Sequence, residues 1–273
     1  MSTKRQVGKE DTGSILARTP VFTLGDFASN LGITPARAID RIKYHMKQNR
    51  VVTLERGLYA TVPPGSRSQT FHPDRYLVAA AARPDAIFAF HAALELLGVA
   101  HSDWNVCTVF TVRRRRKLIL KTTELRFLAH PTALVRKHRE RLGTRQIERQ
   151  SKLLLVTGPE RTLVEGFRQP REVGGLAELV ESASGFGVLD LDLLQQVLAA
   201  YNQRSLWAAT GWFLERFRET FFVSDDILRR FEAHRPRAPQ YLPRGLRSGV
   251  LASRWNLVLP ANVVAGSEPD AVE

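Results

Sequence analysis

Residues 31–50 read LGITPARAIDRIKYHMKQNR, a stretch that predicts one capped, amphipathic helix after a tight turn. Gly32 ends the preceding helix, because glycine adopts the positive φ angle of such a turn without steric cost. Thr34 is expected to cap the next helix, and Pro35 occupies its first position, where proline breaks no hydrogen bond. Apolar residues then recur on one face at the spacing of a buried stripe: Ala38, Ile39, Ile42 and Met46. We therefore expect a helix over residues 35–49 that packs one face onto a core.

The other face of this helix is polar and basic, with Arg37, Arg41, Lys43, Tyr44 and Lys47. Arginines in the first turns of a helix can each form two hydrogen bonds with guanine in the major groove of DNA. Arg37 and Arg41 are therefore predicted to contact bases. Lys43, Tyr44 and Lys47 are better placed for phosphates, which set register rather than sequence preference.

Two further residues of this helix bear on the same prediction. Thr34, at the helix start, completes the predicted DNA-binding set. Asp40 would repel phosphates, so it either accepts a hydrogen bond from a cytosine amino group or pairs with Arg37 or Lys43. The alternatives are that this face is only solvated, as on many surface helices, or that it contacts RNA or protein.

A second helix precedes the turn. Thr23 and Asp26 have the spacing of a capping box and predict a helix over residues 24–31. Ala28 and Gly32 lie four residues apart across the turn, and small residues there let the two helices approach closely.

A hairpin is predicted after the basic helix. Two β-rich runs, at residues 51–54 and 58–62, surround Glu55-Arg56-Gly57, a hairpin-turn signal. Helix, turn, helix and hairpin in this order match a winged helix-turn-helix. Arg56, at the wing tip, is then placed to touch a minor groove or a phosphate. We predict this domain over residues 1–64, followed by a Pro/Gly/Ser linker.

The charge is unevenly distributed. The chain of 273 residues has a net charge of +13, which makes polyanions the expected partners. Residues 1–64 carry 10 Lys/Arg against 5 Asp/Glu, and residues 113–149 carry 13 against 3, whereas the rest of the chain is balanced. A surface built only for solubility would mix both signs throughout.

The remaining chain predicts a larger mixed domain over residues 70–262 and a flexible tail over 263–273, so the fold class is α+β. Helices are expected at residues 73–82, 91–97, 176–182, 189–201, 205–220 and 225–234. Strands are expected within residues 105–112 and 116–130, at 152–157 and near 254–260. Thr157 and Glu160 predict another capping box, opening a helix that runs through Phe167.

A second basic segment lies at a turn between two of these strands: Arg113, Arg114, Arg115, Arg116 and Lys117. Side chains alternate between the faces of a strand, so adjacent arginines cannot all be buried. We expect this patch to meet an anion, which is flanking DNA, an RNA or an acidic partner. The alternative is a solvated hairpin tip.

No motif for catalysis or for a cofactor is present. The histidines lack HxxxH or HExxH spacing, and there is no GxSxG, Walker or dinucleotide-binding pattern. His91 is expected to satisfy a helix start, and the single cysteine, Cys107, to be a buried apolar residue. We therefore predict no catalytic residue, metal or cofactor; a nuclease with a dispersed acidic site is the alternative. Without an apolar leader or membrane span, a cytoplasmic protein is expected.

The order of these segments resembles a known family. An N-terminal winged helix ending in RGLYATVP is followed by FAFHAALELLGV, a basic β-rich stretch and ERTLVEGFRQPREVGGLAELVESA. This order is similar to the AbiEi family of bacterial antitoxin-regulators from type IV toxin–antitoxin and phage-defence loci. The resemblance covers residues 14–185, and Glu160-Arg161-Thr162-Leu163 with Gly174-Gly175 is its most specific element. Arg161 is expected to hold a carbonyl or a carboxylate within the fold.

The resemblance implies two roles and no enzymatic activity. The winged helix would bind inverted repeats in double-stranded promoter DNA as a monomer or dimer and repress its own operon. The second domain would counteract a cognate toxin of the nucleotidyltransferase type, by contact with the toxin or with its target. The alternative is a stand-alone phage-defence regulator, or an RNA- or protein-binding winged helix, without a toxin partner.

Overall fold

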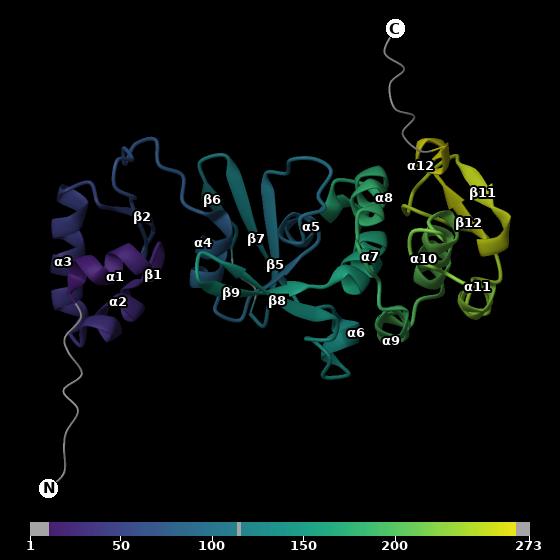
Figure 1. The fold of residues 1–273 in the computed structure, drawn as a ribbon, viewed down its shortest axis with the longest axis horizontal. Helices are drawn as coiled ribbons and strands as arrows, with labels where there is room; N and C mark the ends of the chain where they lie inside the picture. The colour runs from purple at the N-terminus through teal and green to yellow at the C-terminus, as the bar shows by residue number, and fades with distance from the viewer. Residues whose placement is uncertain (1–10, 114–115, 266–273) are drawn as a thin grey trace, which may run out of the picture. The chain divides into compact units, whose positions relative to one another are not determined.

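A computed structural model describes residues 11–113 and 116–265 (Figure 1). The chain forms two compact units, which are described separately. Unit 1 runs through Ala86 and also includes Leu118–Leu125, whereas unit 2 contains Ile87–Lys117 and the chain from Arg126 onward. The predicted boundary lay after residue 64. It falls later because helix α4 (Arg75–Ala82) packs on strands β1 and β3 of unit 1.

Unit 1 is built from helices around a small antiparallel sheet. Its first elements are α1 (Thr12–Arg18), β1 (Val21–Thr23), α2 (Leu24–Leu31), α3 (Pro35–Lys47), β2 (Val51–Glu55) and β3 (Leu58–Thr61). The sheet has the order β1-β3-β2. Strand β1 was not predicted, because three residues are too few to show the apolar–polar alternation of a strand. Val21 and Phe22 are nevertheless buried in it.

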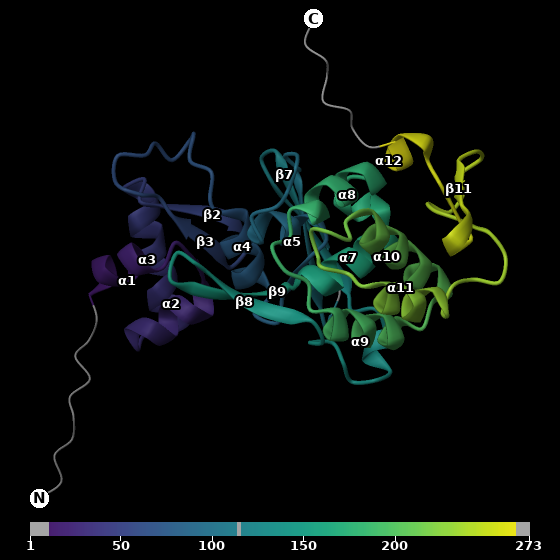
Figure 2. The same ribbon diagram turned by 45° about the vertical axis from the view of Figure 1, so that its right-hand side comes forward.

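Unit 1 contains helices α1, α2 and α3 (Figure 2), and local hydrogen bonds define where α2 begins and ends. The Thr23 side chain accepts from Asp26 N–H, and the Asp26 side chain accepts from Thr23 N–H, so the predicted capping box is confirmed. Gly32 ends α2 with φ +61°, and its N–H donates to the Ala28 carbonyl. The predicted turn between α2 and α3 is therefore confirmed, and the two helices pack against each other.

A hairpin from later in the chain completes unit 1. Strands β6 (Leu118–Leu120) and β7 (Thr123–Ala129) pair antiparallel. Between them, Lys121 Nζ donates to the carbonyls of Gln69 and Phe71, both at 2.9 Å. Gln69, the last residue of the predicted linker, and Phe71 are thus tied to this hairpin.

Unit 2 is organised on a mostly antiparallel sheet. Its strands are the second part of β7, β5 (Val106–Thr111), β4 (Ile87–Ala89), β9 (Lys152–Thr157) and β8 (Thr144–Arg149). Strands β4 and β9 are parallel, whereas β4–β5 and β8–β9 are antiparallel. Strand β9 spans the predicted residues, but β4 and β8 were not predicted as strands. The exposed positions of β8 are so polar and charged that its sequence carries no β signal.

Helices pack around α7 in unit 2. They are α5 (His91–Leu96), α6 (Thr132–Val135), α7 (Pro159–Arg168), α8 (Leu176–Ser184), α9 (Leu191–Tyr201), α10 (Arg204–Arg216), α11 (Asp225–Glu232) and α12 (Ala261–Ala265). Helix α7 contacts α8, α9 and α10, and all but its last residue are buried. Two 3₁₀ turns, Pro170–Val173 and Ser253–Trp255, and strands β10 (Gln240–Tyr241), β11 (Val250–Ala252) and β12 (Leu257–Leu259) complete the unit. The protein is thus a mixed helix–sheet fold, in agreement with the α+β class.

Two local predictions in unit 2 are wrong. Helix α7 has Gly158 as its N-cap, without a side-chain capping bond. The Thr157 hydroxyl instead bonds the Thr162 hydroxyl, and Glu160 accepts from the N–H of Asp190, so tertiary contacts replace the expected capping box. The predicted flexible tail begins within α12, where Val263 is buried. The rest of that tail lies outside the described residues.

In the part of the chain that the structure describes, no helix is long and apolar enough to span a bilayer.

Candidate nucleic-acid interface

Helix α3 presents a continuous exposed face. Its N-cap Thr34 accepts from Arg37 N–H at 3.5 Å, and Pro35 opens the first turn, as predicted. One stripe of the helix is buried against the core that includes Phe27 and Leu31. The predicted DNA-binding residues of this unit all remain exposed: Thr34, Arg37, Arg41, Lys43, Tyr44, Lys47 and, between β2 and β3, Arg56.

The buried stripe of α3 differs from the predicted one. Ala38 and Ile42 are buried as expected, but His45 replaces Met46 as the third buried residue. Met46 is 37% exposed, and its Sδ accepts from the Thr53 hydroxyl on β2. The helix is therefore rotated slightly from the prediction, so that His45 rather than Met46 is covered.

This rotation changes the environment of Arg41. Arg41 lies next to the buried stripe in a helix of 3.6 residues per turn, and its Nη1 donates to Thr12 Oγ1 of α1 at 2.9 Å. Lys43 and Lys47 lie opposite the stripe, with Arg37 on the flank. Arg41 is thus exposed but engaged with its own unit, whereas Arg37 is presented outward.

Asp40 also lies on the outward face. It forms no ion pair with any described residue, so the predicted pairing with Arg37 or Lys43 is not seen. Its carboxylate remains available to accept a hydrogen bond from an external donor such as a cytosine amino group.

The surroundings of His45, at the C-terminal end of α3, lower its pKa. Burial, followed by the charges of nearby Arg50 and Arg41, lowers the pKa of His45 against an opposing effect of Asp11. The His45 imidazole therefore takes up a proton at a lower pH than an exposed histidine does. This residue belongs to the core of unit 1 rather than to its exposed basic face.

The second basic segment connects β5 to β6. Of its residues, Arg113, Arg116 and Lys117 are exposed, while Arg114 and Arg115 lie outside the described residues. The Arg113 carbonyl accepts from the Thr111 hydroxyl at 2.7 Å. The predicted position between two strands is confirmed, and its ligand remains a prediction.

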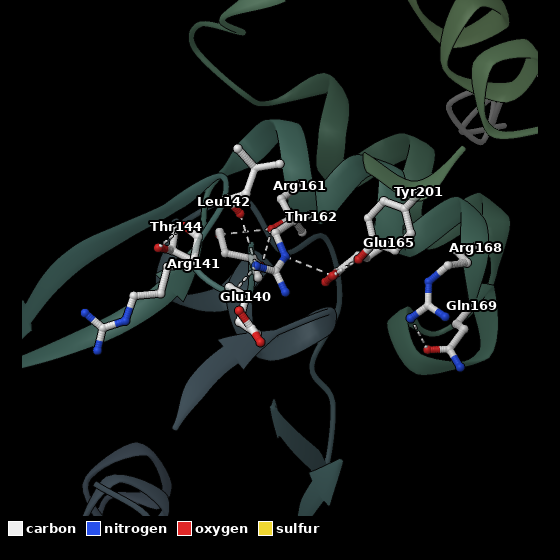
Figure 3. Close-up of polar contacts among 11 residues, drawn as sticks. Glu140, Arg141, Leu142, Thr144, Arg161, Thr162, Glu165, Arg168, Gln169 and Tyr201 are labelled. Atoms are coloured by element: carbon white, nitrogen blue, oxygen red, sulfur yellow. Dashed lines mark hydrogen bonds and ion pairs between the residues drawn. The ribbon is translucent and has the colours of Figure 1, made fainter. Parts of the chain in front are cut away.

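Arg161, in the motif that carried the family resemblance, is completely buried. Figure 3 shows its polar contacts. Its Nη1 donates to the carbonyls of Glu140 and Leu142 at 2.6 and 3.0 Å, and its Nε donates to Glu165 Oε1 at 2.9 Å. The expectation that Arg161 holds carbonyls or a carboxylate within the fold is confirmed.

Tyr201 completes this buried group. Its hydroxyl donates to Glu165 Oε1. Burial and the neighbouring Glu165 raise the pKa of Tyr201 well above its usual value, so the hydroxyl keeps its proton. Burial acts to lower the pKa of Arg161, but Glu165 and Tyr201 outweigh it and raise that pKa. With no exposure to solvent, the group joins α7, α9 and the 140–142 loop and does not form an open site.

A second buried carboxylate, Glu178 on α8, accepts several hydrogen bonds. It accepts from the hydroxyls of Ser102 and Ser182, both at 2.7 Å, and from the N–H groups of His101 and Ser102. His91 lies between Glu178 and Glu95, with its ring nitrogens 3.4 and 3.3 Å from their carboxylates. His91 was predicted to satisfy the start of its helix, and this is wrong: no side chain caps α5, and the ring faces the carboxylates.

Glu178→Gln tests this arrangement. Burial raises the pKa of Glu178, but the Ser102 and Ser182 hydrogen bonds and the nearby His91 outweigh burial and lower the pKa below 4.5. A depressed carboxyl pKa stabilises the fold above the unfolded pKa, and this stabilisation is lost as the pH falls through the folded pKa. We expect Glu178→Gln to cost about 2 kcal/mol in the free energy of unfolding at pH 7 and less below pH ~4.

Urea unfolding at both pH values measures this difference. Glu219→Gln, at an exposed position of the same unit, is the matched control and should change stability little at either pH. An equal loss at pH 7 and at low pH would contradict a role of the Glu178 charge.

Among the described residues, no group of three or more His, Cys, Asp or Glu side chains is placed to hold a metal ion. Cys107 is buried, as predicted.

Comparisons with known proteins identify a solved structure with a similar fold. No protein-family model matches the chain, and no curated protein matches its sequence. The chain is similar in structure to the RV2827C protein from Mycobacterium tuberculosis, with a TM-score of 0.59 and 19% sequence identity over 90% of this chain and 89% of that one. At this identity the likeness concerns the fold alone.

Proposed function

We propose that unit 1 is a winged helix-turn-helix that places α3 in the major groove of double-stranded DNA. The proposal rests on the two different faces of α3, one buried and one exposed. One side is closed over the unit's core, and the other presents Arg37, Lys43, Tyr44 and Lys47 to solvent. A helix of about 20 Å with its first turns free fits a major groove about 12 Å wide.

Each exposed residue has a distinct expected contact. Arg37 lies in the first turn of α3 and would donate two hydrogen bonds to a guanine. Lys43, Tyr44 and Lys47 would contact phosphates, because they lie further along the helix. Arg56 follows β2 and precedes Gly57, which has φ +82° and forms the hairpin turn. This turn would act as the wing and bring Arg56 to the backbone or the minor groove.

We propose further that the chain represses its own promoter at inverted repeats and acts as an antitoxin without enzymatic activity. Two copies on one operator would be spaced by about 10 base pairs or a multiple of that number. The antitoxin role is supported by the AbiEi-like order of segments, including the buried Arg161 motif. The exposed Arg113, Arg116 and Lys117 are the proposed contacts to the toxin, its target or flanking DNA.

Arg37→Ala is the direct test of α3. We expect a loss of about 1–3 kcal/mol in binding to the DNA upstream of the gene, together with relaxed preference at one base position. Lys47→Ala should instead weaken binding to all sequences and reduce the salt slope by about 1. Arg41→Ala should cost less than Arg37→Ala, because Arg41 is already hydrogen-bonded to Thr12. Fluorescence anisotropy at several salt concentrations measures these effects.

Arg67→Ala is the control for these variants. It removes one exposed positive charge from unit 1 outside α3 and the hairpin. If Arg37→Ala left base preference unchanged, or weakened binding no more than Arg67→Ala, then α3 would not be the reading helix.

A further inference from the structure

We propose that Asp40 selects a cytosine in the major groove of DNA. Together with Arg37 and Ala36, it would define a half-site that has guanine and cytosine in neighbouring base pairs and a thymine beside the guanine. The proposal rests on the proposed function, the placement of α3 in a major groove, and names the class of DNA sequence that this helix would select.

Asp40 lies at the middle of the outward face of α3. It is two positions from Ala38 and two positions from Ile42, which are both buried, so its side chain leaves the helix about 160° away from each of them. Arg37 directly precedes Ala38 and is therefore only about 100° away from it. If α3 enters a groove with its outward face first, Asp40 is the side chain that points most directly at the base edges.

The carboxylate of Asp40 is free to accept hydrogen bonds from DNA. Among the described residues, none forms an ion pair or a side-chain hydrogen bond with it. An ionised carboxylate can only accept, and in the major groove guanine and thymine present the acceptors O6, N7 and O4. Cytosine presents its amino donor, whereas the amino donor of adenine lies beside the acceptor N7. Cytosine is therefore the base that a carboxylate at this position fits best.

Arg37 and Ala36 add two further base preferences. Arg37 would donate two hydrogen bonds to guanine. It precedes Asp40 by about 4.5 Å along the axis of α3, and successive bases of a strand are about 3.4 Å apart, so the two side chains reach neighbouring base pairs. Ala36 is exposed in the first turn, where its methyl group suits the methyl group of thymine.

The test is a selection by the full-length protein from a library of random-sequence DNA duplexes. We expect the wild-type protein to enrich a motif that contains this cytosine. Asp40→Asn should change the cytosine to adenine, because an amide can both donate to N7 and accept from the amino group of adenine. Competition between the two duplexes should show a preference of about 5- to 150-fold that is reversed in Asp40→Asn. Asp40→Ala should bind the two duplexes alike.

Asp85→Asn is the matched control. Asp85 is exposed in unit 1, outside α3 and the hairpin, so the substitution removes the same charge at a distance from the proposed base contacts. It should leave the base preference unchanged, whatever it does to the affinity for all duplexes. For Ala36, replacing the selected thymine with uracil, which lacks the methyl group, should lower the affinity about 4-fold, the value for one methyl group removed from water.

The outcomes separate this proposal from the proposed function. If Asp40→Asn still selected cytosine, or if Asp85→Asn shifted the preference in the same way, Asp40 would not read a base, although α3 could still bind DNA through Arg37. An unchanged affinity for the uracil duplex would remove Ala36 from the base contacts. If the wild-type protein enriched no motif, both proposals would fail. Circular dichroism of each variant separates these results from unfolding.

Discussion

Arg161→Met is expected to lower the free energy of unfolding by about 3–5 kcal/mol, the largest effect that we predict for a single substitution. Arg161 and Glu165 are both fully buried, and their side chains are 2.9 Å apart. Methionine fills much of the same volume but leaves the Glu165 charge without its cation. It also removes the donor to the carbonyls of Glu140 and Leu142, which lie in a partly buried position and lose that hydrogen bond.

A combined variant shows how this cost arises. Removing the whole polar group in Arg161→Met/Glu165→Leu/Tyr201→Phe should recover a large part of the lost stability, since replacing all members of a buried pair is often neutral. Arg171→Met, at an exposed position in the same unit, is the control and should change stability by less than about 0.5 kcal/mol. Chemical denaturation followed by circular dichroism provides the measurement. If Arg161→Met cost no more than Arg171→Met, the buried pair would not stabilise the fold.

Gly211→Ala should produce the second large effect, a loss of about 3 kcal/mol, for a steric reason. Gly211 lies within α10, where alanine would ordinarily be the better helix former. A Cβ atom at this position would lie 2.1 Å from the Trp255 ring. Trp255 is fully buried, and its Nε1 donates to Glu215 Oε2 at 2.6 Å, so the ring cannot move aside without breaking this bond.

The matched substitution is Gly25→Ala in α2. A Cβ atom there would meet only the Thr23 hydroxyl, at 3.7 Å, so the variant should be neutral or stabilised by about 0.5–1 kcal/mol. In a Trp255→Leu background, Gly211→Ala should cost clearly less than in the wild-type protein. Thermal unfolding of the four variants of this cycle measures the coupling, and additive losses would contradict a direct clash.

Part of the candidate DNA interface could be predicted from local sequence patterns, and part could not. Its helix, its N-cap and its exposed basic residues follow from spacing within 15 residues, and the structure agrees with them. The hydrogen bond from Thr53 on β2 to Met46 and the one from Arg41 to Thr12 on α1 depend on elements outside α3. The spacing of apolar residues within α3 does not predict these contacts, because the helix is amphipathic whether Met46 or His45 is buried.

The sequence by itself determined the elements whose signals are short-range. The Thr23–Asp26 capping box, the Thr34 cap and the Gly32 turn each join residues at most four positions apart, so neighbouring residues specify them. Only the tertiary structure decided which distant groups meet. Arg161 bonds carbonyls about 20 residues away, and Arg204 lines one cavity with Arg237. Such partners depend on how the helices and strands pack to bury apolar surface, and many pairings fit the same local pattern.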